Sequence, residues 1–313
     1  MKSPTKSNLY DIIDRTLGGN TLRDYPLSRF TTFRIGGPAD IIAFPQNENE
    51  ICAVTEISRN ERIPLIPLGA GSNLLFSDHG YRGIILSLNR MKHVEIIDNN
   101  KNEIKLVAMA GASLPGIISK FSEFCAVGPS RLWGIPGQLG GSIACNAGAM
   151  NINIADLICE IELLDQNNKK IVSKFRDLDY GYRTMKLPPG AIVTSATLVA
   201  HKGDADQVLN ELDIAKKKRR ASQPHGLPSA GCVFRNPSSS NPAGAIIDRL
   251  GMKGMRIGSA EVSERHANFI VNRGKARAAD VVRLIELIKK RAWDEQRVSL
   301  ELEIRIMESG DSN

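Results

Sequence analysis

The sequence predicts an α+β fold of about two domains, and three observations lead to this prediction. Its 313 residues correspond to roughly two units of about 150 residues each. Short β-rich runs alternate irregularly with amphipathic segments, rather than in a regular strand–helix series. Hydrophobic residues make up 42% and charged residues 24% of the chain, an ordinary globular mixture that excludes wholesale disorder.

The elements follow from local patterns along the chain. Residues 1–20 are expected to form a weakly structured lead that ends at Gly18 and Gly19, and they lack the apolar stretch of a secretory signal. No apolar run approaches the ~18 residues of a membrane span. Helical spacing of apolar residues predicts helices over 49–60 and 114–125. Strands are predicted over 39–45, 64–68, 83–88, 104–109, 160–164, 170–175 and 191–200.

A domain boundary is expected near residues 205–223, where a helix rich in Lys and Arg leads into the proline- and glycine-rich sequence QPHGLPSAG. Beyond it, apolar residues at i, i+4, i+7 and i+11 predict a helix over 279–293. Residues 298–307 alternate apolar and polar side chains, which predicts one strand. This alternation puts Glu301 and Glu303 on the same face, so periodicity does not choose between the two acids.

The basic charge is concentrated in one segment. Residues 214–260 contain nine basic residues and one acid, Asp248, which predicts a local positive field and an anionic partner. Nucleic acid is a weak candidate, because aromatic residues are only 5% of the chain and none is interleaved with the basic run. The five cysteines are scattered without a Cys-x-x-Cys pair, which favours free thiols in a reducing cytoplasm over disulfides or a metal site.

Two glycine-rich segments, 67–75 and 134–148, are the strongest candidates for a ligand site. Residues 132–155 contain five glycines and no charged residue, which indicates that this stretch is buried against something. Glycines permit close approach of the backbone, so that successive N–H groups can hold a pyrophosphate. Neither segment fits Gly-x-Gly-x-x-Gly or Gly-x-x-x-x-Gly-Lys-Ser/Thr, so a dinucleotide here would not be held as in a Rossmann fold or a P-loop. A pair of tight turns is the alternative interpretation.

Seven blocks of the sequence resemble, in order, the UDP-N-acetylenolpyruvoylglucosamine reductase family, often called MurB. They are TTFRIGGPAD (31–40), PLGAGSNLL (67–75), WGIPGQLGGSIACNAGA (133–149), GYR (181–183), AGCVFRNP (230–237), HANFIVN (266–272) and LELEIRI (300–306). The resemblance implies an FAD-binding region of the vanillyl-alcohol-oxidase (PCMH) type over 21–205, in lobes of about 21–90 and 91–205. It also implies a smaller α+β substrate-binding domain over 215–297 and a terminal strand, 298–307, that returns to the FAD region.

The family's reaction is the NADPH-dependent reduction of UDP-N-acetylglucosamine enolpyruvate to UDP-N-acetylmuramate, in peptidoglycan precursor synthesis, through a bound FAD. The resemblance implies this reaction here, with dissociable FAD and no nucleic acid or membrane partner. By position, Arg183 resembles the arginine that clamps the substrate carboxylate, and Cys232 resembles the proton donor, which is a serine in many members. The motif selects Glu301, the first acid of LELEIRI, as the third catalytic group. Thr184 and Met185 stand where the family commonly has serine.

Further residues are implied by the same blocks. The expected substrate-binding residues are Tyr182, Arg235, Asn236 and His266. The expected FAD-binding residues are Gly69, Ala70, Gly71, Ser72, Asn73, Gly134, Pro136, Gly137, Gly140, Ser142, Asn146, Ala147 and Gly148. The short interval between Arg183 and Cys232 resembles the subgroup that lacks a tyrosine-bearing lid. Two alternatives remain: another flavoenzyme of this fold that acts on a sugar or alcohol, and a basic nucleic-acid-binding protein.

Overall fold

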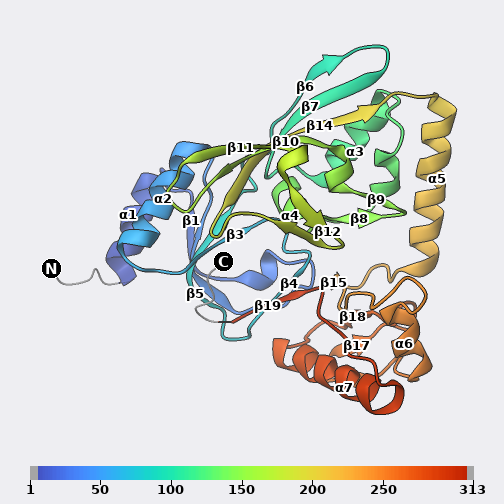
Figure 1. Ribbon diagram of the computed structural model, residues 1–313. Coiled ribbons are helices and arrows are strands. Elements are labelled where there is room, and N and C mark those ends of the chain that lie inside the picture. Colours follow the sequence, from blue (N-terminus) through green and yellow to red (C-terminus); the bar gives the residue numbers. More distant parts are fainter. Residues whose placement is uncertain (1–5, 309–313) are drawn as a thin grey trace.

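The computed structural model describes residues 6–308, whose strands form three main sheets (Figure 1). The first sheet has the order β1-β2-β5-β3, with β2, β5 and β3 parallel and β1 antiparallel. Its strands are β1 (Thr21–Pro26), β2 (Pro38–Ala43), β3 (Leu65–Leu68) and β5 (Tyr81–Ser87), and its helices are α1 (Lys6–Thr16) and α2 (Glu48–Asn60). Ile41 and Ala43 pack with the helices, whereas Ile42 belongs to a separate cluster, as alternation along a strand requires.

The lead predicted for residues 1–20 is instead helical over Lys6–Thr16, so the expectation of weak structure is wrong for the described part. Leu9, Ile13 and Leu17 are buried, at 5%, 0% and 2% exposure, and pack with α2 and the first sheet. Their spacing of four residues was a helical signal in the sequence. The rest of that prediction, residues 1–5, lies outside the described residues.

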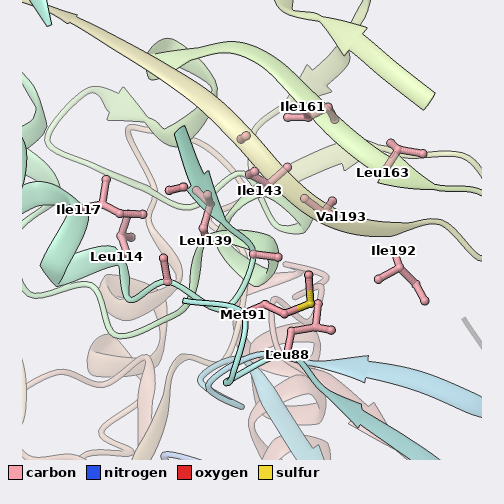
Figure 2. Close-up of a cluster of buried hydrophobic side chains, with 14 of the residues drawn as sticks. Leu88, Met91, Leu114, Ile117, Leu139, Ile143, Ile161, Leu163, Ile192 and Val193 are labelled. Carbon is pink, nitrogen blue, oxygen red and sulfur yellow. The ribbon is translucent and has the colours of Figure 1, made fainter. Parts of the chain in front are cut away.

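The second sheet is antiparallel, with the order β11-β10-β14-β7-β6. Its strands are β6 (Val94–Asn99), β7 (Glu103–Met109), β10 (Ile158–Leu164), β11 (Lys170–Lys174) and β14 (Ile192–His201), and α3 (Leu114–Glu123) and α4 (Leu139–Ala144) accompany it. Figure 2 shows Leu114 of α3 and Leu139 of α4 in the same buried cluster as Ile161 and Val193 of the strands. This apolar layer fixes α4, and with it the second glycine-rich segment.

The third sheet is antiparallel, with the order β15-β18-β17-β16, and carries the C-terminal helices. It consists of β15 (Ser229–Cys232), β16 (Arg256–Ile257), β17 (Ala260–Val262) and β18 (Phe269–Asn272), with α6 (Ala243–Arg249) and α7 (Ala278–Gln296). The helix predicted over 279–293 is confirmed as α7. Helix α5 (Ala205–Ser222) runs along one side of the molecule, from the second sheet to this C-terminal region (Figure 1).

Short pairs complete the fold. They are β4 (Leu74–Phe76) with β19 (Arg305–Met307), β8 (Gly148–Ala149) with β9 (Ile152–Asn153), and β12 (Asp179–Gly181) with β13 (Thr184–Lys186). The 3-10 turns are Leu27–Arg29, Pro129–Leu132, Ile154–Leu157 and Phe175–Asp177. The strand predicted over 298–307 is wrong except for Arg305–Met307, which pairs with β4 in parallel. Before it, Leu302 forms only an isolated bridge with Phe234, and the chain bends at Glu303 and Ile304.

The N-terminal and C-terminal regions share a core. Phe33, Ile35 and Leu75 are buried in the cluster formed by α6, α7 and the third sheet. The carboxylate of Asp78, just after β4, accepts hydrogen bonds from Ala278 N at 2.8 Å and Ala279 N at 3.1 Å. A side chain of one region therefore caps the first turn of α7 in the other. Among residues 6–308, no helix is both long and apolar enough to cross a membrane.

Candidate functional site

Arg183 occupies the tight turn between β12 and β13, with a left-handed backbone at φ 57°. Its Nε donates to Glu303 Oε1 at 2.9 Å, and its Nη2 donates to Gly148 O at 2.8 Å. Non-glycine residues in this region of φ are strained and collect at functional sites. The turn thus directs a guanidinium toward the second glycine-rich segment and leaves its Nη1 without a partner among the described residues.

The two acids of the LELEIRI block lie in different environments. Glu301 is exposed, whereas the side chain of Glu303 is 17% exposed and forms the ion pair with Arg183. The prediction that they share one strand face is wrong, because no regular strand runs through them. Burial raises the pKa of Glu303, and the neighbouring charges of Arg183 and Arg235 oppose this shift. The structure therefore brings Glu303, and not Glu301, to Arg183.

Cys232 is the last residue of β15 and faces the same ion pair. Burial, and to a smaller extent the negative charge of Glu303, raises the pKa of its thiol to about 12. The positive charges of Arg183 and Arg219 act in the opposite direction. The thiol therefore carries its proton at neutral pH, as a proton donor must, and lies among charged neighbours. Cys145, at the end of α4, is influenced by Arg183 and Glu303 too, and burial raises its pKa to about 11.

Two more arginines complete the group that we call the Arg183 cluster: Arg183, Arg219, Cys232, Arg235 and Glu303. Arg235 follows β15, and its Nε is buried without a hydrogen-bond partner among the described residues. Arg219 comes from α5, donates to Trp133 O at 3.1 Å, and has a pKa lowered by burial. Sequence reasoning counted Arg219 only as part of the basic run. Its helical spacing from Ala215, Glu211 and Val208, the buried residues of α5, was a signal that could have singled it out.

The two glycine-rich segments face each other. A Cβ placed on Gly69 would lie 3.6 Å from Gln138 Oε1 and 3.9 Å from the Cα of Gly141. A Cβ on Gly137 would lie 3.1 Å from Ser142 Oγ and 3.8 Å from Ser72 Oγ. The loop after β3 and the segment that opens α4 are thus close enough to bind one ligand.

Unsatisfied polar groups mark the same place. Ala70, Gly71 and Ser72 donate no backbone hydrogen bond to any described residue. Gln138 Oε1 is buried and also lacks a hydrogen-bond partner among the described residues. Buried polar groups are normally paired, and successive free N–H groups form an anion-binding site. These residues fit the pyrophosphate and polar edges of a dinucleotide such as FAD.

The second segment offers fewer free donors. Gly140 N donates to Ala110 O at 2.9 Å, Ser142 N to Gln138 O at 2.9 Å, and Ala147 N to Ser142 O at 2.8 Å. Asn146 donates through its amide to Gly181 O at 2.9 Å, which supports the turn of Arg183. Gly148 accepts from Arg183, Gly134 touches Arg219, and Pro136 is exposed. Much of this segment therefore supports the site rather than exposing N–H groups.

The remaining predicted substrate residues are divided. Tyr182 is 51% exposed and lies under the Arg183 guanidinium, 5.3 Å from ring centroid to Cζ. Asn236 is exposed and uses its Oδ1 to accept from Ala243 N at 3.1 Å, at the start of α6. His266 makes an edge contact with the Phe269 ring, with centroids 5.0 Å apart, and accepts from Asn268 N, and burial lowers its pKa. Of these three residues, only Tyr182 contacts the Arg183 cluster.

Three of the nine basic residues in the positive segment form ion pairs with nearby acids. Lys217 pairs with Asp213, Lys253 with Asp248, and Arg256 with Glu261. Arg219 and Arg235 are the members of the segment that interact with the catalytic candidates Cys232 and Glu303. The positive field expected from the sequence is thus weaker than the count of basic residues suggested.

Two cavities lie elsewhere in the fold. One of about 300 Å³ is lined by residues of α1, β1 and β2, and one of about 510 Å³ lies between α2 and the β10–β11 turn. Both cavities are lined by Pro64, which precedes β3. The first glycine-rich loop follows the opposite end of this strand. Neither contains a residue of the Arg183 cluster, so the site is defined by its side chains and backbone donors.

Comparison with known proteins agrees with this geometry. The family model of the C-terminal domain of UDP-N-acetylenolpyruvoylglucosamine reductase matches residues 223–307, and that of an FAD-binding domain matches residues 39–173. The reductase of a Synechococcus species is 38% identical over 297 residues, 94% of this chain and 94% of that protein. The reductase of Syntrophobacter fumaroxidans is 37% identical over 286 residues, 90% and 82% of the two chains.

A solved structure gives the same result. The crystal structure of the reductase (MurB) from Thermus caldophilus has a TM-score of 0.76 and 33% identity, and the match covers 91% of this chain and 97% of that one. The α+β fold with an FAD-binding region and a C-terminal MurB domain is confirmed. The resemblance of the seven sequence blocks is confirmed too, and the chain belongs to the UDP-N-acetylenolpyruvoylglucosamine reductase (MurB) family.

Proposed function

We propose that the protein reduces UDP-N-acetylglucosamine enolpyruvate to UDP-N-acetylmuramate with NADPH and FAD, as an enzyme of peptidoglycan precursor synthesis. The observation that carries this proposal is the Arg183 cluster, which joins a buried thiol and an oriented guanidinium next to two facing glycine loops. An oxidase of a sugar or alcohol would need neither a carboxylate clamp nor a proton donor in this arrangement.

Gly69–Asn73, Gln138 and Gly141 would hold the FAD. The free N–H groups of the first loop suit its pyrophosphate, and the absence of side chains at Gly69 and Gly141 permits close approach. When bound and reduced by NADPH, FAD would supply the hydride for the terminal carbon of the enolpyruvyl double bond. We expect it to dissociate reversibly.

Arg183 binds the substrate carboxylate and stabilises the enolate that develops when the hydride adds. Glu303 accepts from Nε and Gly148 O accepts from Nη2, so the guanidinium is held in one orientation with Nη1 available. A positioned cation is most effective where charge develops, because no reorganisation is then needed during the reaction. The sequence motif selected Glu301 as the third catalytic group. We assign this role to Glu303 instead, because Glu303 is the acid that contacts Arg183.

Cys232 transfers its thiol proton to the carbon that bears the carboxylate. Its raised pKa keeps the thiol protonated at neutral pH. The resulting thiolate lies near the positive charges of Arg183 and Arg219, which stabilise it. Tyr182, Arg235, Asn236 and His266 remain proposed substrate contacts, and Arg235 is supported by the unpaired Nε beside Glu303.

We propose the domain division of the sequence prediction, with FAD bound over 21–205 and substrate bound by 215–297. The matches to the two family models support it, and the pairing of β19 with β4 supports the return of the terminal segment to the FAD region. We propose that the enzyme acts in the cytoplasm without nucleic-acid partners. Its free cysteines and the pairing of its basic residues support this.

The test is turnover of purified, FAD-loaded protein with NADPH and UDP-N-acetylglucosamine enolpyruvate. We expect NADPH consumption that depends on the enolpyruvyl compound, and a product two hydrogens heavier by mass spectrometry. A protein that bleaches its flavin with NADPH but is not reoxidised by this compound would favour the sugar or alcohol oxidoreductase. Failure of the protein to bind FAD would exclude both the reductase and the sugar or alcohol oxidoreductase.

A further inference from the structure

Helix α5 docks through one face onto the segment that leads into the second glycine-rich region. Its buried residues are Val208, Glu211 and Ala215, and Arg219 follows one turn later on the same face. The flanks of this face are exposed, with Leu209 at 61% on one side and Ile214 at 46% on the other. The docked face meets residues 128–134, which contain the 3-10 turn Pro129–Leu132.

The first contact of this face is a buried carboxylate. The Glu211 side chain is 10% exposed, and its Oε2 accepts from Gly128 N at 2.8 Å. Its Oε1 accepts from both Nε and Nη2 of Arg131, at 3.0 Å and 2.6 Å. Glu211 thus satisfies a backbone N–H and pairs a guanidinium with two donors, which defines one position of α5 relative to the segment.

The second contact is Arg219, two helical turns further along. Its Nη1 donates to Trp133 O at 3.1 Å, and a Cβ on Gly134 would lie 2.7 Å from its Cδ. No carboxylate of a described residue pairs with this half-buried guanidinium. A buried cation without a partner is costly, so its free donors are available to an anion of the ligand. Its charge also acts on Cys232.

We propose that Glu211 is a positioning residue that fixes α5 on Gly128 and Arg131, and thereby holds the Arg219 guanidinium against Gly134 and beside Cys232. Arg219 is then the residue that contacts the substrate anion, and Glu211 acts only through it. This inference rests on the proposed reductase function for its substrate, but the docking of α5 can be measured without any ligand.

The ligand-free measurement uses tryptophan fluorescence. The chain has two tryptophans, and Trp293→Phe removes the exposed one on α7 and leaves Trp133 as the reporter. Lys216 of α5 lies over the Trp133 ring at 5.7 Å. In this background, we expect Glu211→Gln to increase acrylamide quenching of Trp133. The matched control is Asp213→Asn, an exposed acid of the same helix that pairs with Lys217 and should leave quenching unchanged.

The functional measurement is a double-mutant cycle on the dissociation constant of UDP-N-acetylglucosamine enolpyruvate, followed by the spectrum of oxidised FAD in the holoenzyme. We expect Glu211→Gln to weaken binding about tenfold when Arg219 is present. In an Arg219→Ala background, where binding is already weakened, Glu211→Gln should have no further effect on substrate affinity. Arg131→Gln, which breaks the same pair from its more exposed side, should reproduce the pattern if Glu211→Gln folds poorly.

The outcomes separate the inference from the proposed function. Unchanged quenching in both Glu211→Gln and Arg131→Gln, or equal loss of substrate affinity with and without Arg219, would overturn the positioning role. Increased quenching in the Glu211→Gln variant, together with a wild-type holoenzyme that fails to bind the enolpyruvyl compound, would leave the docking role standing and refute the substrate.

Discussion

The glycine-rich segments and the Arg183 cluster lie in contact but are built in different ways. The segments are short continuous stretches that offer backbone groups and open space, and the second has no charged residue. The cluster draws its side chains from β15 and the residues after it, the turn after β12, α5 and the chain before β19. Cofactor binding is thus encoded locally, whereas the acid and the cations come together only in the folded chain. Variants in the two regions should therefore fail in different ways.

The largest effect is expected from Cys232→Ala. Removing the proton donor should slow reoxidation of the flavin by the enolpyruvyl substrate by roughly 10²–10⁴-fold. Flavin content and reduction by NADPH should be nearly unchanged, because neither needs this proton. Stopped-flow absorbance separates the two steps, and Cys232→Ser serves as a partly active control. Equal slowing of both steps would show that the effect is not loss of a proton donor.

A smaller effect should distinguish Glu303 of the cluster from Glu301, the other acid of the LELEIRI block. We expect Glu303→Gln to slow reoxidation about tenfold to a hundredfold, because it removes the carboxylate that orients Arg183. Glu301→Gln is the matched control, and its exposed side chain predicts a rate within about twofold of wild type. Single-turnover reoxidation measures both. The reverse order of effects would restore the residue chosen by the sequence motif.

The glycine-rich segments should respond to Gly141→Ala with weaker FAD binding and an intact fold. A Cβ on Gly141 meets no atom within 4 Å, and alanine favours helices over glycine by about 1 kcal/mol, so the apoprotein should be no less stable. The added methyl enters open space in the segment that faces Gly69, and we expect FAD affinity to fall about tenfold. Titration of apoprotein with FAD, together with thermal unfolding, tests this.

Gly71 provides the contrast within the same region. Its φ is +60°, and a Cβ there would lie 2.3 Å from Phe30 O, so Gly71→Ala should lower the unfolding temperature of the apoprotein itself. If Gly141→Ala lowered the unfolding temperature as much as Gly71→Ala, we would conclude that glycine at position 141 is required for the fold and not for FAD binding.

The smallest expected effect is an absence of pH dependence. Because burial raises the pKa of Cys232 to about 12, the protonated donor persists well above the ordinary thiol pKa of ~8.5. The rate of reoxidation should therefore show no decline through ~8.5 as pH rises, whereas an ordinary thiol would lose its donor form there. Stopped-flow reoxidation across this range tests it, with Cys232→Ser as a control without a thiol. An inflection near 8.5 in wild type alone would contradict the shift.

Helices and strands whose apolar residues pack into the core at regular spacing could be predicted from the sequence. The helix expected over 279–293 and the strand expected over 191–200 became α7 and β14 with end shifts of a few residues. The glycine-rich segments could be identified because their composition is local. The helix α1 was missed although three apolar residues carried its period, since Gly18 and Gly19 suggested a loop.

The catalytic candidates depended on tertiary contacts that the sequence does not display. Glu303 is distinguished from Glu301 by the bend after the isolated bridge of Leu302 with Phe234, two segments far apart in the chain. Arg219 differs from Lys217 and Lys218 only by the face of α5 that docks on residues 128–134. Arg183 and Cys232 could be identified only through the resemblance to the family. A family motif marks residues that meet in the folded protein, although the sequence does not show the contacts between them.

The shared core has a consequence for the order in which the chain is synthesised. Phe33 and Ile35 leave the ribosome early, yet they pack among residues of the third sheet and α7. The Asn272 side chain that binds Phe33 O lies 239 residues later in the sequence. Until that part of the nascent chain emerges, these two apolar side chains lack most of the cluster in which they are buried. They constitute a long-range contact that slows completion of the fold and exposes an aggregation-prone surface during translation.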